Sequence, residues 1–356
     1  MSSFVFQGQQ RVCFHTFMQR ALYHPTHGYY RSARIKQGQR GDYITSPSIS
    51  PVFAQCISNH IAPLLRQNPT WSIAEIGPGL GDLACDLYES LSVRDQLPVE
   101  YHLVEPSQQS RIIQMQHISE RCAPLAELVE WSEHIPNDFH GIIIANEVLD
   151  ALPVYLLETC SQMNLRSVQV EQDNDHAIWT HTAPDSRLVD ALDMRNIPLF
   201  PNYRYEISLD IQEFFQGLAQ RMASGICLLF DYGYSRSEYY HPQRKMGTLT
   251  AYSQHRQCDD LLDQPGQQDI SCHVDFNLVA DAATACGFEI QDICTQEFFL
   301  YQNGISQVLQ NQASQLNCID YQRLRHDAYL LTAPEEMGTL VKAVCLSKNY
   351  SNQSRM

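Results

Sequence analysis

The chain has 356 residues, of which 44% are hydrophobic, and a formal net charge of −16 from 24 basic and 40 acidic side chains. This length and composition are those of a globular protein that can bury a full hydrophobic core. The acidic balance and the lack of any basic run argue against a nucleic-acid substrate, because phosphate binding draws on clustered Lys and Arg. All apolar runs are shorter than the roughly 18 residues that cross a bilayer, so we expect no membrane insertion.

The twelve cysteines are scattered singly, without a C-x-x-C pair or a His/Cys cluster at metal spacing. Thiols in apolar surroundings, such as Cys85, Cys227 and Cys345, behave as small core residues. The N-terminal segment has no basic region followed by an apolar stretch, and it is not an Arg-rich amphipathic segment. We therefore predict a cytoplasmic protein without a structural metal.

Helical patterns dominate residues 1–70, which we predict to form an N-terminal helical cap. Residues 14–22 suit a helix that ends before a His-Pro pair, and residues 52–65 carry apolar side chains at a helical period. Between them, residues 41–47 are rich in turn formers and predict a loop.

From residue 71 onwards, short apolar strands alternate with helical segments such as residues 80–91 and 108–121. This alternation predicts parallel strands in an α/β sheet. Further helices are expected at 211–222 and at 276–286, the second with Asp275 as its N-cap. The seven expected strands lie at 73–76, 101–104, 128–131, 142–145, 226–231, 288–294 and 341–347.

Residues 156–205 interrupt this alternation. Two strand-like segments, 166–171 and 177–181, are separated by a polar stretch, which predicts a β-hairpin rather than a βα unit. We therefore predict an insertion over 156–205, on the substrate side of a core formed by 71–155 and 206–356.

The most informative segment is a strand that leads directly into a glycine-rich turn. The turn has glycines at alternate positions, Gly77, Gly79 and Gly81. Glycines let the backbone approach a nucleoside cofactor closely, but the dinucleotide fingerprint G-x-G-x-x-G would need its third glycine at Asp82. The acidic Glu75 would repel a pyrophosphate and suits the cationic amino and sulfonium groups of S-adenosylmethionine. The turn therefore predicts a methyltransferase.

Polar residues also follow the next strands. Glu105 could accept both ribose hydroxyls through one carboxylate. Trp131 and Ser132 would border the adenine, although Trp131 is equally compatible with an ordinary core position. Asn146, after the fourth strand, would border the methyl-transfer position. A glycine turn can merely join a strand to a helix, but successive strands with polar groups at their carboxyl ends favour a nucleoside site.

Eight segments spread along nearly the whole chain carry the motifs of one family: Ala21–Tyr30, Gly41–Pro47, Glu75–Gly81, Ala145–Pro153, Asp231–Gly233, Gly247–Leu249, Asp269–Phe276 and Met337–Gly338. They resemble the MidA-like family of S-adenosylmethionine-dependent methyltransferases, which includes a mitochondrial protein arginine methyltransferase needed for complex I assembly. The resemblance implies a class I methyltransferase fold, with a Rossmann-like seven-stranded sheet. It also implies S-adenosylmethionine as cofactor and a protein as substrate. Independently of the resemblance, we keep a homodimer as a candidate assembly.

If the substrate is arginine, its guanidinium keeps its proton in water. Carboxylates must then orient it and help to remove a proton as the methyl arrives. The candidates for this catalytic role are Glu147, Asp150 and Glu206. If the chain turns helical after Asn146, Glu147 and Asp150 share one face. The alternative is that these two acids only favour a helix N-terminus.

Ser48 is a departure, because the family usually has Glu at this position. If that Glu helps to hold a cationic substrate, its loss bears on arginine specificity. The main hypothesis is therefore a protein arginine methyltransferase, and the second is an assembly or binding factor that keeps the cofactor fold with weak or no turnover. A third, an NAD-dependent oxidoreductase, is disfavoured by Asp82.

Overall fold

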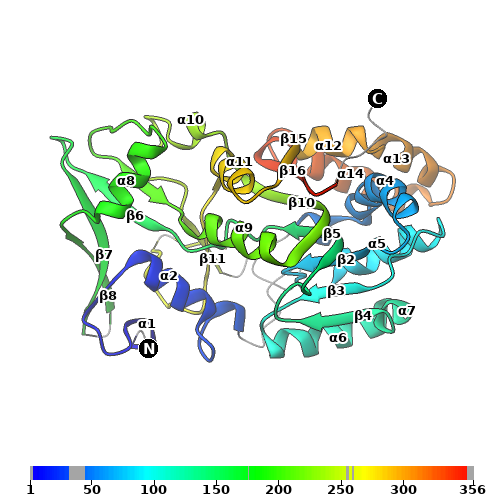
Figure 1. Ribbon diagram of the computed structural model, residues 1–356, viewed down its shortest axis with the longest axis horizontal. Coiled ribbons are helices and arrows are strands. Elements are labelled where there is room, and N and C mark those ends of the chain that lie inside the picture. The colour runs from blue at the N-terminus through cyan, green and yellow to red at the C-terminus, as the bar shows by residue number, and fades with distance from the viewer. Residues whose placement is uncertain (1–2, 32–44, 175, 254–255, 259, 351–356) are drawn as a thin grey trace. The chain divides into compact units, whose positions relative to one another are not determined.

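The computed structural model describes residues 3–31, 45–174, 176–253, 256–258 and 260–350 (Figure 1). These residues form two compact units. The first, here called the core unit, comprises Ile35–Val148, Phe215–Tyr232 and Ala283–Met356, and the second unit comprises Met1–Arg34, Leu149–Phe214 and Gly233–Ala282. The predicted boundaries after residues 70, 155 and 205 divide the chain differently and stay a prediction. Residues 41–44 of the expected loop lie outside the described residues.

The core unit is built on a mixed sheet with the strand order β15-β16-β10-β5-β2-β3-β4 (Figure 1). The pairs from β10 to β4 are parallel, and β16 is antiparallel to both of its neighbours. The strands are β2 Ser72–Ile76, β3 Tyr101–Val104, β4 Val129–Ser132, β5 Phe139–Asn146, β10 Met222–Tyr234, β15 Glu289–Thr295 and β16 Val341–Lys348. All seven predicted strands and the predicted class I methyltransferase fold are thus confirmed.

Alternating apolar residues explain why these strands are central. Ile142 and Ile144 on β5 and Ile226 and Leu228 on β10 are at most 4% exposed, and all four belong to one hydrophobic cluster with the core-unit helices. Because side chains alternate between the faces of a strand, residues two apart reach the same cluster. The helices are α3 Ser46–Ile49, α4 Pro51–Gln67, α5 Asp82–Ser92, α6 Gln108–Arg121, α7 Ala123–Ala126, α12 Gln296–Gln302, α13 Ile305–Ala313, α14 Cys318–Thr332 and α15 Met337–Leu340.

The second unit is mainly antiparallel. Its sheet has the order β1-β7-β6-β9 with β8 paired to β7, so the predicted hairpin is confirmed as β7 and β8. A smaller sheet has the order β12-β11-β13, and β14 pairs with the end of β10. The elements are α1 Ser3–Phe6, β1 Arg11–Cys13, α2 Phe14–Tyr23, the 3-10 turn Tyr29–Arg31, β6 Tyr155–Thr159, β7 Leu165–Asp173, β8 His176–Thr182, α8 Ser186–Met194, β9 Arg204–Ile207, α10 Arg236–Tyr239, β11 Thr250–Ser253, β12 Arg256–Gln257, β13 Asp269–Ser271 and β14 Val274–Asp275.

Two helices run across the boundaries between the units in sequence, α9 Asp210–Arg221 and α11 Phe276–Ala285. Asp275 caps α11 as predicted, since its Oδ1 accepts hydrogen bonds from the N–H groups of Asn277 and Leu278 at 3.0 and 3.2 Å. Across the described ranges, none of the helices is both long and apolar enough to span a membrane.

Candidate functional site

The glycine turn joins β2 to α5, and its geometry requires glycine. Gly77, Gly79 and Gly81 have φ of +64°, +59° and +91°, in the left-handed region that other residues rarely adopt. A Cβ on Gly77 would lie 3.1 Å from the Val148 side chain, and one on Gly81 would lie 2.8 Å from Ile118. The turn is therefore a tight cradle of main-chain atoms at the carboxyl end of a central strand.

A hollow of about 280 Å³, including the part open to solvent, lies at this turn. It is lined by Glu75, Gly77, Asp82 and Asn146, with Thr45 and Pro47 among the remaining residues. Asn146 Oδ1 is buried and has no hydrogen-bond partner among the described residues. A buried acceptor without a donor is costly, so an unpaired amide oxygen beside a carboxyl group fits a ligand with an ammonium group.

Glu75 is almost fully buried, at 3% exposure. Burial raises the pKa of its carboxyl to about 8, because the charged form loses its hydration. The Tyr101 hydroxyl donates to Glu75 Oε2 at 2.8 Å, and this hydrogen bond lowers the pKa of Glu75. The negative charge of Asp82 raises the same pKa further. Close to neutral pH this carboxyl holds its proton in part, and a cation in the hollow would favour its ionised form.

Asp82 opens α5 and is engaged by two side chains from α6. Its Oδ1 lies 2.9 Å from His117 Nε2 and 2.7 Å from Arg121 Nη1. The residue at the position of the missing third glycine is thus part of an ion-pair network between two helices.

Glu105, which follows β3, and Trp131 on β4 are joined to the glycine turn by a side chain that we did not predict. Glu105 Oε1 accepts a hydrogen bond from the Ser107 N–H at 2.7 Å. The Gln114 amide nitrogen donates to Glu105 Oε2 at 3.2 Å and to the carbonyl oxygen of Gly79 at 2.9 Å. Trp131 Nε1 donates to the Gln114 amide oxygen at 3.1 Å. The structure therefore brings Gly79, Glu105 and Trp131 into one hydrogen-bonded group.

Ser132 ends β4 next to this group. Its hydroxyl donates to the carbonyl oxygen of His134 at 2.6 Å, and its own carbonyl oxygen accepts from the Glu105 N–H at 2.9 Å. The main chain of Ser132 thus positions Glu105.

β5 ends at Asn146, and the next residue, Glu147, has a strained backbone. Glu147 has φ of +53°, which costs a non-glycine residue roughly 1–3 kcal/mol and persists only where the surroundings enforce it. Its N–H donates to the carbonyl oxygen of Phe230 at 2.8 Å. Its Oε1 accepts from Asn146 Nδ2 at 3.0 Å and from the Ser46 N–H at 3.3 Å. The carboxylate is thus held by the neighbouring Asn146 side chain and by the Ser46 main chain, while Phe230 holds the Glu147 main chain.

The helix that we considered after Asn146 is absent from the described chain, which forms a turn there. The Val148 N–H donates to Asp231 Oδ2 at 3.1 Å, and the Leu152 N–H to the carbonyl oxygen of Leu149 at 3.2 Å. The shared helical face of Glu147 and Asp150 and the alternative of a helix N-terminus are therefore both wrong. Asp150 belongs to the second unit, where its carbonyl oxygen accepts from the Cys272 N–H at 2.9 Å.

Glu206 lies in the second unit on β9 and is 2% exposed. Its Oε1 accepts from the N–H groups of Thr248 and Leu249 at 2.7 and 2.8 Å. Its Oε2 accepts from the hydroxyls of Thr248 and Tyr239 at 2.8 and 2.9 Å. Four donors on one carboxylate are the pattern of a group that holds a loop in place. These contacts give no support to the catalytic role of Glu206, which stays a prediction.

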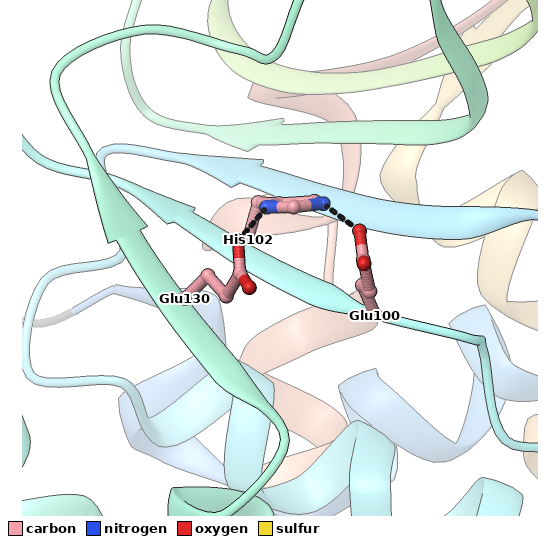
Figure 2. A group of neighbouring side chains, drawn as sticks. All are labelled: Glu100, His102 and Glu130. Atoms are coloured by element: carbon pink, nitrogen blue, oxygen red, sulfur yellow. Dashed lines mark hydrogen bonds and ion pairs between the residues drawn. The ribbon is translucent and has the colours of Figure 1, made fainter.

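Among the described residues, one cluster has ligand atoms close enough to one another for a metal ion: Glu100, His102 and Glu130. Figure 2 shows the two carboxylates at opposite ends of the imidazole ring, with Glu100 Oε2 3.1 Å from Nε2 and Glu130 Oε2 3.7 Å from Nδ1. Metal ligands converge on one point, whereas these groups are arranged as a bridge between β3 and β4.

A mixed sheet of this order, with a glycine turn after β2 and an acidic residue after β3, defines a nucleoside-binding enzyme of the class I methyltransferase type. The chain belongs to the family described as putative S-adenosyl-L-methionine-dependent methyltransferases, whose sequence profile matches residues 56–294. It is therefore an S-adenosylmethionine-dependent methyltransferase. The glycine cradle and the unpaired Asn146 oxygen fit the cofactor, since they offer main-chain contact and an acceptor for its amino group.

Individual relatives agree with this assignment. Proteins named protein arginine methyltransferase NDUFAF7 are 28% identical in Drosophila melanogaster, over 93% of this chain and 80% of the relative, and 26% identical in Homo sapiens, over 90% and 77%. A crystal structure of a COG1565 superfamily member from Burkholderia thailandensis with bound S-adenosyl-homocysteine is 29% identical, with a TM-score of 0.90 over 99% of this chain and 91% of that one.

The predicted cytoplasmic location is wrong on this comparison, because the curated relatives are named as mitochondrial proteins. The cysteine pattern and the composition of the N-terminal segment are only indirect indicators of the compartment, so they were not sufficient to predict it.

Proposed function

We propose that this methyltransferase transfers the methyl group to an arginine of a protein substrate, with Glu147 as the catalytic carboxylate. The observation that carries the proposal is the strained Glu147 directly after β5, next in the chain to Asn146, which lines the hollow at the glycine turn. The names of the curated relatives support arginine as the acceptor. The net charge of −16 suits a basic protein segment.

The cofactor half of the proposed site comprises Glu75, Gly77, Gly79, Gly81, Glu105, Trp131, Ser132 and Asn146. Glu75 and the Asn146 oxygen would receive the amino-acid end, and Glu105 would accept the ribose hydroxyls. The sulfonium supplies the methyl group. One nitrogen of the guanidinium forms the new bond to carbon while the carbon–sulfur bond breaks, and S-adenosylhomocysteine leaves.

Glu147 would orient the guanidinium and receive the proton that the methylated nitrogen loses. Its Oε1 already accepts from Asn146 and from Ser46, which fixes the direction of the carboxylate. The carboxylate would then pair with the N–H groups of the guanidinium. In-line alignment of nitrogen, methyl and sulfur would follow from this fixed geometry.

Ser48, in place of the family's Glu, motivated the alternative of an assembly factor without turnover. In the structure, Ser48 makes local contacts at the start of a helix. Ser48 Oγ accepts from the Thr45 N–H at 2.9 Å and donates to the Thr45 carbonyl oxygen at 2.8 Å, completing a capping box at the start of α3. Glu at the same position of a capping box would make an equivalent contact. The departure from the family pattern therefore keeps the turn that presents the Ser46 N–H to Glu147.

The test is Glu147→Gln, which keeps the side-chain shape and the acceptor oxygen but removes the charge. We expect methyl transfer to fall by roughly 10²–10⁴-fold, the usual contribution of a positioned acid–base group. Calorimetry should give an affinity for S-adenosylhomocysteine within about threefold of wild type, because we assign Glu147 no contact with the cofactor. A group that acts only in the transition state lowers kcat and leaves binding unchanged.

Transfer can be measured with methyl-labelled S-adenosylmethionine and a lysate from cells that lack this protein, followed by acid hydrolysis and identification of methylarginine. Glu289→Gln is the matched control, because Glu289 is an exposed carboxylate on β15. Normal transfer by Glu147→Gln would remove Glu147 from the mechanism. Label on a residue other than arginine would contradict the proposed acceptor.

A further inference from the structure

Gln114 is fully buried in the middle of α6, where no cofactor motif marks it. A buried amide must pair both its N–H groups and its oxygen. Its nitrogen donates to the Gly79 carbonyl oxygen and to Glu105 Oε2, at 2.9 and 3.2 Å. Its oxygen accepts from Trp131 Nε1 at 3.1 Å. One side chain thus contacts the glycine turn, the acid after β3 and the aromatic residue at the end of β4.

The three partners leave the amide a single orientation. A carbonyl oxygen and a carboxylate can only accept, and an indole N–H can only donate. If the amide were flipped, its oxygen would face two acceptors and its NH₂ group would face the Trp131 N–H. The contacts therefore fix the rotation of Gln114, and Gln114 in turn fixes its partners.

The Glu105 carboxylate is the partner for which this matters most. Oε1 is held by the Ser107 N–H at 2.7 Å and Oε2 by Gln114, so the plane of the carboxylate is defined. A carboxylate held in one plane offers its two oxygens side by side to the two ribose hydroxyls. Loss of the Gln114 donor removes one of the contacts that hold this plane, so part of the ordering would have to occur when the cofactor binds.

We propose that Gln114 is a positioning residue for the cofactor, which locks the Gly79 carbonyl, the Glu105 carboxylate and the Trp131 indole into one pre-formed surface. This inference rests on the part of the proposed function that assigns the turn, Glu105 and Trp131 to the cofactor. It requires nothing of the methyl acceptor. Gln114 does not touch the reacting atoms, so its loss acts on cofactor affinity and not on the transfer step.

The first variant is Gln114→Met, which has a similar length and no strong hydrogen-bonding group. It removes two donors, one of them to a charged group, and we expect S-adenosylhomocysteine to bind roughly 10- to 100-fold more weakly. The transfer rate at saturating cofactor should stay within about threefold of wild type. Gln116→Met is the matched control, because Gln116 is exposed on the same helix and its amide nitrogen donates to the exposed Glu120 carboxylate at 3.0 Å.

The second variant, Gln114→Glu, separates positioning from simple packing. The new carboxylate can still accept from Trp131, but when ionised it cannot donate to Glu105 and repels it. A single proton shared between the two carboxylates restores a donor at lower pH. We expect the loss of affinity relative to wild type to be several-fold larger at pH 8.5 than at pH 6. The nearby groups Glu75, Asp82, Arg111 and His117 are common to all variants, so their titration largely cancels in this ratio.

Calorimetry with S-adenosylhomocysteine on the full chain distinguishes the outcomes. Wild-type affinity in Gln114→Met, or a pH-independent loss in Gln114→Glu, would overturn the positioning role and leave the proposed function intact. A lack of binding by the wild-type protein would overturn both. If Gln114→Met fails to fold, as judged by circular dichroism, the pH dependence of Gln114→Glu decides the question.

Discussion

At the scale of single residues, the proposed contact of Glu75 with the amino-acid end of the cofactor predicts that cofactor binding is coupled to proton release. Burial places its pKa at about 8 in the ligand-free protein, so at pH 7 the carboxyl is mostly protonated. A cationic amino group beside Glu75 would favour the carboxylate and lower this pKa, so we expect binding at pH 7 to release a proton. By linkage, we expect the affinity to rise as the pH increases from 6 towards 8.

Calorimetry of S-adenosylhomocysteine binding at pH 7 in buffers of different ionisation enthalpy measures this proton directly. We expect a release that approaches one proton per site in the wild type and disappears in Glu75→Gln. Near pH 8 the α-amino group of the ligand, with a typical pKa of about 7.7–8.0, begins to lose its own charge, so the increase should level off there. Proton uptake, or the same release in Glu75→Gln, would contradict the assignment.

The same scale shows which site residues a sequence reveals. The three glycines and Glu105 lie directly after strands, so a local pattern predicts their position. Gln114 was missed because its partners Gly79 and Trp131 are 35 and 17 residues away, and nothing within α6 indicates these contacts. The turn at Glu147 was missed for a similar reason. The partners of its main chain, Phe230 and Asp231, are about 83 residues away and hold the chain where a helix could have started.

At the scale of elements, the passage from β2 to α5 depends on Gly81, which is the N-cap of α5 with φ of +91° and ψ of +17°. Gly81→Ala would meet the cost of roughly 1–2 kcal/mol for the left-handed conformation, and its Cβ would lie 2.8 Å from the Ile118 side chain. We expect the free energy of unfolding to fall by roughly 1–3 kcal/mol and cofactor affinity to fall with it, because the cradle is displaced.

Gly217→Ala is the control for that substitution. Gly217 lies in α9, and an added Cβ meets nothing within 4 Å, so the change should stabilise the protein by roughly 0.5–1 kcal/mol through the lower entropy of the unfolded chain. Urea unfolding of both variants gives the comparison. Equal stability of the two would mean that the turn tolerates a side chain and is not strained.

Most elements could be predicted because their patterns are local. The strands around Ile73, Ile142 and Ile226 are short apolar runs between turn formers, and β7 and β8 flank a polar stretch. Helix α14 was not predicted, since in its 15 residues only Ala328 and Leu331 are buried and no apolar stripe results. The pairing of β1 with β7, where Arg11 lies opposite Glu171, joins segments 160 residues apart, which a strand pattern alone does not specify.

At the scale of the whole molecule, every residue that we assign to the cofactor belongs to the core unit. Hydrogen exchange with and without S-adenosylhomocysteine should therefore slow in peptides that contain residues 77–82, 105–107 and 146–148. At a ligand concentration of about 100 Kd, binding stabilises the native state by roughly 2.7 kcal/mol, so amides that exchange through opening of the site should slow by up to about 100-fold. The β7–β8 hairpin of the second unit provides the internal reference, because none of the proposed cofactor residues lies in it. Protection confined to that hairpin would place the ligand outside the glycine turn, whereas protection of the core-unit peptides that is lost in Gly81→Ala would tie it to the turn.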